Sequence, residues 1–269
     1  MTKARFKALI WGYYRKEGRS MPWRKTRDPY AILVSEVMLQ QTQVARVEGF
    51  YEKFLKQFPD FRSLAAAKTK DVLKAWQGLG YNRRALSLKR AAEIIVRDFG
   101  GKLPRGRAAL ESLPGIGKGT SGSLLAFAFN EPEIFIETNV RRIFIHFFFP
   151  KAEKVTDAEI ERYIERTMDV KNPREWYWAL MDYGAFLSAS AGTNSNRRSA
   201  HYKKQSVFAG SDRELRGKML RCMLKEKKRV TFRSLIKILQ IPRARVEKIA
   251  KGLAREGFIV KKENYICIK

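Results

Sequence analysis

The chain has 269 residues, and its 55 lysines and arginines against 27 aspartates and glutamates leave a formal net charge of +28. A chain of this length can bury a core without disulfides or metals, and its 45% hydrophobic residues exclude wholesale disorder. Because so strong a positive field attracts polyanions, we expect a nucleic acid as the partner, with an anionic membrane surface as the alternative. No amphipathic membrane anchor is evident, which favours the nucleic acid.

The two cysteines, Cys222 and Cys267, lie far apart in the sequence. They exclude a disulfide framework and a four-cysteine zinc or iron–sulfur site, so we expect reduced side chains and no metal. The longest apolar runs, 143–149 and 124–129, are too short to span a bilayer. Residues 1–19 lack the uninterrupted apolar core of a signal peptide, so we expect a soluble intracellular protein.

Most of the chain is predicted to be helical. Apolar residues form a helical stripe through 3–17, and Asp28 followed by Pro29 is typical of a helix start. Further helices, separated by glycines, are expected at 43–57, 60–66, 70–76, 83–98, 107–112, 119–129, 139–149, 157–168 and 173–188. The phenylalanine-rich end of 139–149 also fits a buried strand.

The composition changes after residue 188. Residues 189–210 are rich in serine, asparagine and glycine and contain no acidic residue, which predicts a loop or tether. Beyond them, three helices are predicted at 212–225, 231–239 and 242–256, followed by two short strands at 258–261 and 265–269. This winged-helix pattern over 211–269 would place its third helix in a DNA groove, and protein contacts are the alternative.

A glycine-rich turn at 113–118, Leu-Pro-Gly-Ile-Gly-Lys, lies between two predicted helices. Gly115 and Gly117 allow a tight turn, and the N–H groups that open the next helix point outward beside Lys118. Such a helix–hairpin–helix suits one phosphate of a DNA strand. A plain interhelical turn is the alternative.

Two glutamates are candidates for acid–base chemistry. Glu36 lies among apolar residues such as Val34 and Val37, where burial would raise its pKa and let it act as a general acid. The same position also suits a partly exposed helix residue. Glu137 precedes a predicted helix start, where an acid either serves chemistry or complements the helix dipole.

Six motifs, in order, resemble the endonuclease III superfamily of helix–hairpin–helix (HhH-GPD) DNA glycosylases, and within it the adenine DNA glycosylase (MutY) family. They are MPWR at 21–24, SEVMLQQTQ at 35–43, GLGY at 78–81, LPGIG at 113–117, NVRR at 139–142 and MDYGA at 181–185. The resemblance implies a mostly α fold over 1–188 with two subdomains, 20–130 and 1–19 plus 131–188, and DNA across the cleft. A small α+β winged-helix domain would follow at the C-terminus.

The resemblance also implies roles for single residues. Glu36 falls on the acid that protonates the leaving purine, and Glu137 on the aspartate that stabilises the sugar cation once the base is flipped out. Gln41 and Tyr81 fall on positions that wedge into the opened duplex. The residues expected around the base are Trp23, Arg24, Leu39, Thr42, Gly119, Asn139 and Trp178. Those expected on DNA, from the resemblance or from their charge, also include Gly115, Gly117, Lys118, Thr120, Arg197, Arg198, Lys203, Lys204, Arg243 and Arg245.

The chain departs from the family at five places. Glu137 is one methylene longer than the family's aspartate, and Gly119 stands where the bifunctional branch has the lysine of Schiff-base chemistry. Trp178 replaces a glutamate or glutamine that faces adenine. Residues 194–204 stand where the cysteines of an iron–sulfur cluster belong, and the winged helix replaces the domain that reads 8-oxoguanine. We expect no cofactor, although the hairpin is a candidate site for a monovalent cation.

These features predict a monofunctional, monomeric DNA glycosylase of base excision repair, cytoplasmic and associated with the nucleoid. Its partner would be double-stranded DNA with a mismatched or damaged base, adenine opposite guanine or 8-oxoguanine first, and it would bind no membrane. The alternatives are a glycosylase for thymine or uracil opposite guanine or for hypoxanthine, and a non-catalytic DNA-binding clamp. The retained Glu36 favours an enzyme and a purine.

Overall fold

The computed structural model describes residues 1–190, 194–204, 207–225 and 229–269. Contacts between residues divide the chain into two units. Unit 1 comprises 1–36, 103–112 and 116–204, and unit 2 comprises 37–102, 113–115 and 205–269. Of the predicted tether at 189–210, residues 191–193 and 205–206 lie outside the described residues.

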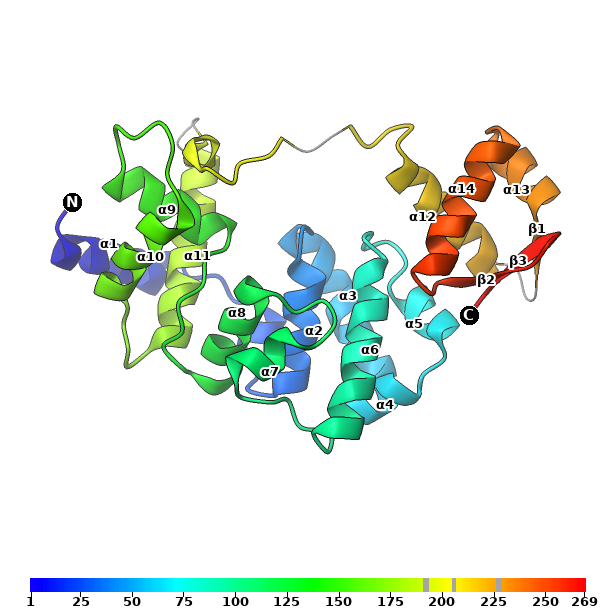
Figure 1. The fold of residues 1–269 in the computed structure, drawn as a ribbon. Coiled ribbons are helices and arrows are strands. Elements are labelled where there is room, and N and C mark those ends of the chain that lie inside the picture. Colours follow the sequence, from blue (N-terminus) through cyan, green and yellow to red (C-terminus); the bar gives the residue numbers. More distant parts are fainter. Residues whose placement is uncertain (191–193, 205–206, 226–228) are drawn as a thin grey trace. The chain divides into compact units, whose positions relative to one another are not determined.

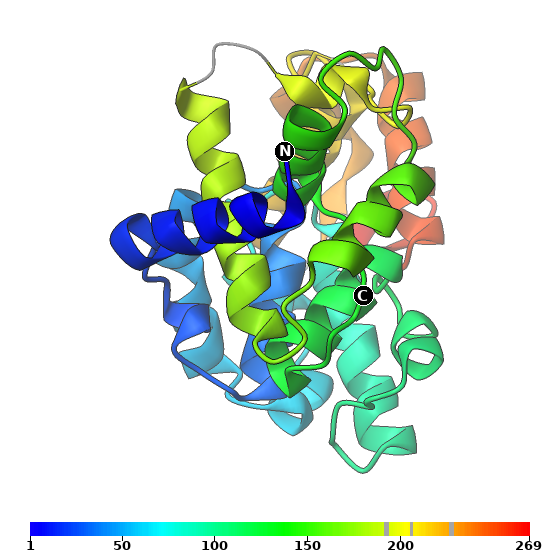
Figure 2. The same cartoon turned by 90° about the vertical axis from the view of Figure 1, so that its left-hand side faces the viewer.

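Unit 1 is a layer of helices around an aromatic core. Figure 2 shows α1 lying across α11, and Phe6 on α1 contacts the rings of Phe144 and Trp176. Its elements are α1 (Lys3–Glu17), η1 (Pro22–Arg24), the start of α2 (Pro29–Leu39), α7 (Arg107–Glu111), α8 (Lys118–Phe129), α9 (Thr138–Phe148), α10 (Asp157–Thr167), α11 (Pro173–Ser190) and η2 (Ser195–Arg198). The phenylalanine-rich end of 139–149 is therefore helical.

Local capping explains where several of these helices begin. Asp28 accepts hydrogen bonds from the backbone N–H groups of Tyr30 and Ala31, as its position before Pro29 predicts. Thr156 and Glu159 form a capping box that opens α10. The mostly α fold predicted from the sequence is confirmed.

Unit 2 contains a helical layer and the C-terminal domain. Figure 1 shows α4 beside α6, and Phe54 and Trp76 are fully buried there. Its elements are the end of α2, α3 (Val44–Gln57), α4 (Phe61–Ala66), α5 (Thr69–Ala75), α6 (Arg83–Asp98), α12 (Asp212–Lys225), β1 (Val230–Thr231), α13 (Phe232–Leu239), α14 (Arg243–Arg255), β2 (Ile259–Lys261) and β3 (Tyr265–Ile268).

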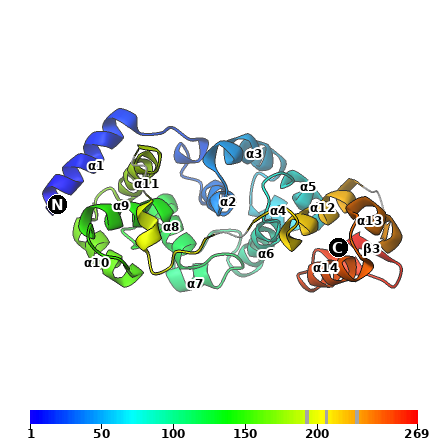
Figure 3. The ribbon, with the colours of Figure 1, turned by 90° about the horizontal axis from the view of Figure 1, so that it is seen from above.

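The C-terminal domain has a three-stranded antiparallel sheet in the order β1-β3-β2. Val230 pairs with Ile266, so β1 adds a strand to the hairpin predicted at 258–261 and 265–269. Two residues are too few for an alternating pattern, which is why the sequence does not indicate β1. Figure 3 shows α13 and α14 beside β3. Among the described residues, no helix is both long and apolar enough to cross a membrane.

Candidate active site

Glu36 and Glu137 lie close enough for the charge of one to affect the other. Glu36 is half-buried near the end of α2, and burial is the main reason why its pKa rises to about 7. The negative charge of Glu137 raises it further, whereas a hydrogen bond from the Ser123 hydroxyl on α8 and the charge of Arg24 lower it. The glutamate can therefore hold a proton near neutral pH.

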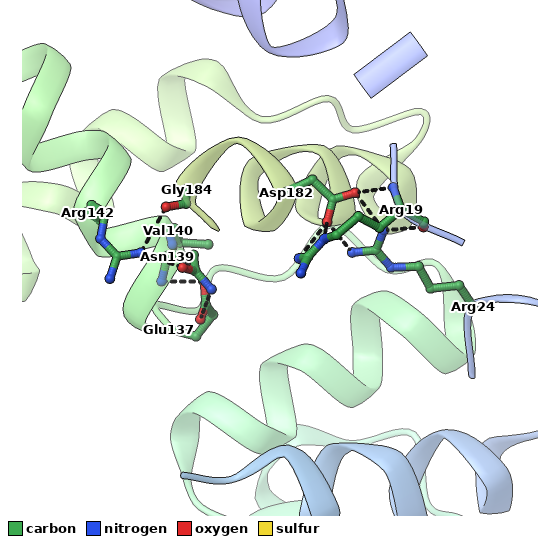
Figure 4. A network of polar contacts seen from close by, with 8 residues as sticks. All are labelled: Arg19, Arg24, Glu137, Asn139, Val140, Arg142, Asp182 and Gly184. Atoms are coloured by element: carbon green, nitrogen blue, oxygen red, sulfur yellow. Dashed lines mark hydrogen bonds and ion pairs between the residues drawn. The ribbon is translucent and has the colours of Figure 1, made fainter. Parts of the chain in front are cut away.

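Glu137 is the N-cap of α9. Its Oε1 accepts hydrogen bonds from the backbone N–H groups of Asn139 and Val140, both at 2.7 Å, and Asn139 Nδ2 lies 3.3 Å from Oε2 (Figure 4). Burial raises the pKa of the Glu137 carboxyl, while these backbone bonds and Arg142 act against the rise. The longer side chain thus still caps the helix, although aspartate is the usual choice.

The two carboxyls differ in the hydrogen bonds that their oxygens accept. Two negative charges that affect each other in a poorly solvated site are costly, so the pair tends to keep one proton. Glu137 Oε1 already accepts two N–H groups at the positive end of α9, whereas Glu36 accepts one rotatable hydroxyl. This difference favours the proton on Glu36 and the negative charge on Glu137.

Hydrogen bonds between α9 and α11 hold Asn139, the residue that also bonds to Glu137. Arg142 donates Nη1 to Asn139 Oδ1 at 2.6 Å and to the Gly184 carbonyl at 2.8 Å (Figure 4). A Cβ on Gly184 would lie 2.6 Å from both the Cβ and the carbonyl oxygen of Asn139. Only glycine permits this approach, which explains the glycine of the motif at 181–185.

Asp182 on α11 binds two arginines of the N-terminal segment, Arg19 and Arg24. It is 2% exposed and accepts both Nη1 and Nη2 of Arg24 at 2.8 Å each, and the backbone N and Nε of Arg19 at 2.9 and 2.7 Å (Figure 4). The Arg24 guanidinium lies 5.4 Å from the Trp178 ring, which also stacks on Phe127. Trp178 is 8% exposed, so little of the surface that was expected to meet a base is open to a ligand.

Gly119 lies next to the backbone that leads into Glu137. A Cβ at Gly119 would lie 3.9 Å from the Ile136 carbonyl oxygen, an ordinary van der Waals contact, so an alanine would fit at this position. Gly117 is the N-cap of α8 without a side-chain cap bond, and Lys118 is exposed in its first turn. Thr120, also expected on DNA, is half-buried in the same turn.

In unit 2, Gln41 and Tyr81 both have left-handed backbones, with φ of 54° and 45°. Arg84 ties their two loops together: it donates to Gln40 and Gly80 carbonyls at 2.5 and 3.2 Å. Its other acceptors are the carbonyls of Val37, Met38 and Leu79 and the hydroxyl of Thr42. Burial lowers the pKa of Arg84 to about 10. The strained loops are thus held before any ligand arrives.

The hairpin residue Gly115 has φ of +83°, and a Cβ there would lie 2.7 Å from Ser87 Cβ, so the turn needs a glycine.

Two further residues were expected around the base. Of these, Trp23 is buried and Leu39 is half-buried.

The 3-10 helix η2 and the residues around it pack against α9. Asn196 donates Nδ2 to the Thr138 carbonyl at 3.0 Å, one residue from Glu137. Arg198 donates to carbonyls at the other end of α9, those of Ile145, Phe149 and Ala152. The guanidinium of Arg198 is therefore held by backbone carbonyls of the protein itself. The other basic residues of this segment that were expected on DNA are exposed, namely Arg197, Lys203 and Lys204.

The arginines predicted for DNA on α14 also have protein partners. Arg243 pairs with Glu247 at 2.8 Å, and Arg245 donates Nη2 to Asp212 at 2.9 Å. Over the described residues, no three His, Cys, Asp or Glu side chains gather as metal ligands would.

The sequence did not indicate Ser123, Arg84 or Asn196 as parts of these sites, because each acts through contacts with residues distant in sequence. Arg142 and Asp182 could have been found, since they lie inside the motifs at 139–142 and 181–185.

Comparisons with known proteins relate this geometry to a family. A family model described as HhH-GPD superfamily base excision DNA repair protein matches residues 34–168. The adenine DNA glycosylase of Buchnera aphidicola subsp. Baizongia pistaciae is 33% identical over 201 residues, which cover 73% of this chain and 56% of that protein. The chain thus spans just over half the length of this relative.

Similarity to thymine glycosylases is found in the comparison of sequences and in the comparison of structures. The thymine/uracil-DNA glycosylase of Methanothermobacter thermautotrophicus is 29% identical over 187 residues, covering 68% of this chain and 85% of that protein. A solved structure of a thermostable thymine-DNA glycosylase matches with a TM-score of 0.64 and 26% identity, covering 73% of this chain and 92% of that one.

Proposed function

The chain belongs to the HhH-GPD superfamily of base excision DNA repair proteins, and we propose that it is a monofunctional DNA glycosylase that removes mispaired adenine from double-stranded DNA. The observation that carries the proposal is the pair of Glu36 and Glu137. Both carboxyls lie in one poorly solvated site, and their hydrogen bonds favour a proton on Glu36 alone. Base excision needs such an acid and such an anion together.

The reaction follows from these two roles. Glu36 donates its proton to a ring nitrogen of the flipped base while the N-glycosidic bond breaks and its electron pair leaves with the base. The Glu137 carboxylate stabilises the positive charge that develops on the sugar. Water then bonds to the sugar carbon and returns a proton to Glu36. Gly119 offers no amine, so the abasic strand stays intact.

A single-turnover cleavage panel tests the proposal. Labelled duplexes carry adenine opposite 8-oxoguanine, guanine or cytosine, and each is read with and without hot alkali beside Glu36→Gln. We expect breaks that need alkali, are fastest for a mispaired adenine and are absent in the variant. Normal turnover by Glu36→Gln would refute the mechanism. Strand breaks that appear without alkali would contradict the monofunctional assignment.

A second candidate substrate is thymine or uracil opposite guanine. The absence of a side chain at Gly119 and the similarity to a thymine/uracil-DNA glycosylase and to a solved thymine-DNA glycosylase structure favour it. Adding these mispairs and hypoxanthine to the panel decides between the bases. Tight binding without cleavage of any duplex would instead favour a non-catalytic clamp.

We also propose that the protein works as a monomer on chromosomal DNA. Its net charge of +28 makes copies of the chain repel one another and attracts the duplex. Sedimentation of the free protein and of its complex with one duplex measures the state directly, and a dimer in both would overturn this part.

A further inference from the structure

Ser123 on α8 has two hydrogen-bond acceptors within reach of one hydroxyl. The residue is 3% exposed, and its Oγ donates to the Thr120 carbonyl, three residues earlier, at 3.0 Å. The same hydroxyl is within hydrogen-bond reach of the Glu36 carboxyl and lowers the pKa of that acid. A serine hydroxyl carries a single proton, so it donates to one of these two acceptors at a time.

Ser123 is the polar residue on one face of α8. Residues three and four apart in a helix share a face, so Ser123 lies with Gly119 and Ala126. A Cβ at Gly119 would lie 3.9 Å from the Ile136 carbonyl oxygen, so this face lies along the segment that leads into Glu137. Glycine and alanine have no side-chain donor, which leaves Ser123 as the residue of these three that can donate a hydrogen bond from its side chain.

Close packing fixes the position of α8. A Cβ at Gly122 would lie 2.6 Å from the Cβ of Phe135, so the helix is in direct contact with the segment before α9. Phe135 in turn stacks on Tyr177 of α11, with ring centroids 3.9 Å apart, and its backbone N donates to the Tyr177 hydroxyl. Because the helix is held in this way, the Ser123 hydroxyl can change its acceptor by rotation about a single bond.

The two acceptors of Ser123 correspond to the two protonation states of Glu36. While Glu36 holds its proton, it carries no full negative charge, and the Thr120 carbonyl is a good alternative acceptor. When Glu36 gives the proton to a ring nitrogen of the base, the electron pair of the glycosidic bond leaves with the base and Glu36 becomes a carboxylate. A hydrogen bond to a charged acceptor is about twice as strong as one to a neutral acceptor, so the hydroxyl then turns to Glu36.

We propose that Ser123 is a positioning residue whose hydroxyl follows the proton of Glu36: it donates to the Thr120 carbonyl before the reaction and to the Glu36 carboxylate as the base leaves. An interaction that is stronger in the transition state than in the ground state accelerates the reaction. The inference rests on the proposed function, because it needs Glu36 to act as the acid.

Two charged side chains also act on Glu36. The negative charge of Glu137, before α9, raises the pKa of Glu36, and the positive charge of Arg24 on η1 lowers it. Asp182 on α11 binds the Arg24 guanidinium. A substitution at Ser123 leaves all three charges in place, so a change in the pH dependence reports the hydroxyl.

The test compares Ser123→Ala with Ser121→Ala in the full chain. Ser121 lies on the same helix and is also buried. It makes the same kinds of bond, to the Lys118 carbonyl at 3.0 Å and to the Glu111 carboxyl at 2.8 Å. Ser121→Ala therefore removes a matched hydroxyl whose partner is a different acid.

Single-turnover excision is measured from pH 5 to pH 9 on adenine opposite 8-oxoguanine, or on the mispair that the cleavage panel shows to be cut fastest. Below pH 6, Ser123→Ala should be about tenfold slower, because the bond to the developing carboxylate is lost. Above pH 8 the two rates should converge, because Glu36 without the hydroxyl is a weaker acid and keeps its proton to higher pH. Ser121→Ala should follow the unmodified protein throughout.

A second measurement does not depend on excision. A carbon NMR titration of the side-chain carboxyls, with the Glu36 signal assigned by its loss in Glu36→Gln, follows the ionisation of Glu36 in the free protein. Its midpoint should rise in Ser123→Ala, because a donor to the charged form is removed, and stay unchanged in Ser121→Ala.

An unchanged midpoint, an unchanged rate, or a rate that falls by the same factor at every pH would overturn the inference, since a serine needed only for packing gives such results. An equal effect of Ser121→Ala would do the same. A chain that excises no base, but in which Ser123→Ala raises the midpoint, would contradict the proposed function alone.

Discussion

Replacing Glu36 by glutamine should make the protein more stable at alkaline pH while it abolishes base removal. Burial raises the pKa of Glu36 from 4.5 to about 7, so the folded state binds a proton that the unfolded state has lost between these values. Stability therefore falls as the pH rises through this range, at about 1.4 kcal/mol per unit of pKa shift. Glutamine cannot ionise, so the variant should gain about 3 kcal/mol at pH 8 but only about 1 kcal/mol at pH 5.

Urea unfolding of both proteins at pH 5 and pH 8 measures this difference. Glu48→Gln, on the exposed side of α3, is the matched control and should show no gain at either pH. The same proton governs the reaction, so excision by the unmodified protein should fall about tenfold from pH 6 to pH 8. A pH-independent stability difference for Glu36→Gln would refute the buried acid, even if the variant were inactive.

Three further changes test the surroundings of the pair. Gly119→Lys places an amine beside the backbone that leads into Glu137, and we expect strand breaks without alkali and a covalent complex trapped by borohydride; Lys118→Ala in the same assay is the control. Asn196→Ala removes the bond to the Thr138 carbonyl, worth about 1 kcal/mol, and should slow excision severalfold at unchanged DNA affinity. Gly184→Ala forces a Cβ against Asn139 and should lower the free energy of unfolding by about 2 kcal/mol, which a urea melt would detect.

Much of the fold could be predicted from the sequence because the signals are local. The predicted helices are present with ends within two residues, since apolar periodicity and caps such as Asp28 and Thr156 act over a few neighbouring residues. The candidate acids could also be found this way, because Glu36 and Glu137 stand inside or beside recognisable motifs. The sequence did not determine the protonation state of either carboxyl.

Contacts between distant segments decided that state. Glu36 and Glu137 are a hundred residues apart, and only packing brings Ser123 to one and leaves the other capping α9. The same holds for Asn196, whose amide reaches the residue after Glu137.

The charges of the C-terminal domain show the limit of the sequence most clearly. Composition identifies a basic domain and so a polyanionic partner, because net charge needs no fold to be counted. Composition cannot tell which arginines are available to a ligand: Arg245 is bound to Asp212, whereas Arg221 is exposed. An ion pair forms where the fold brings two side chains within a few ångströms, so the sequence determines the sum of the charges and the tertiary structure determines which of them can meet a ligand.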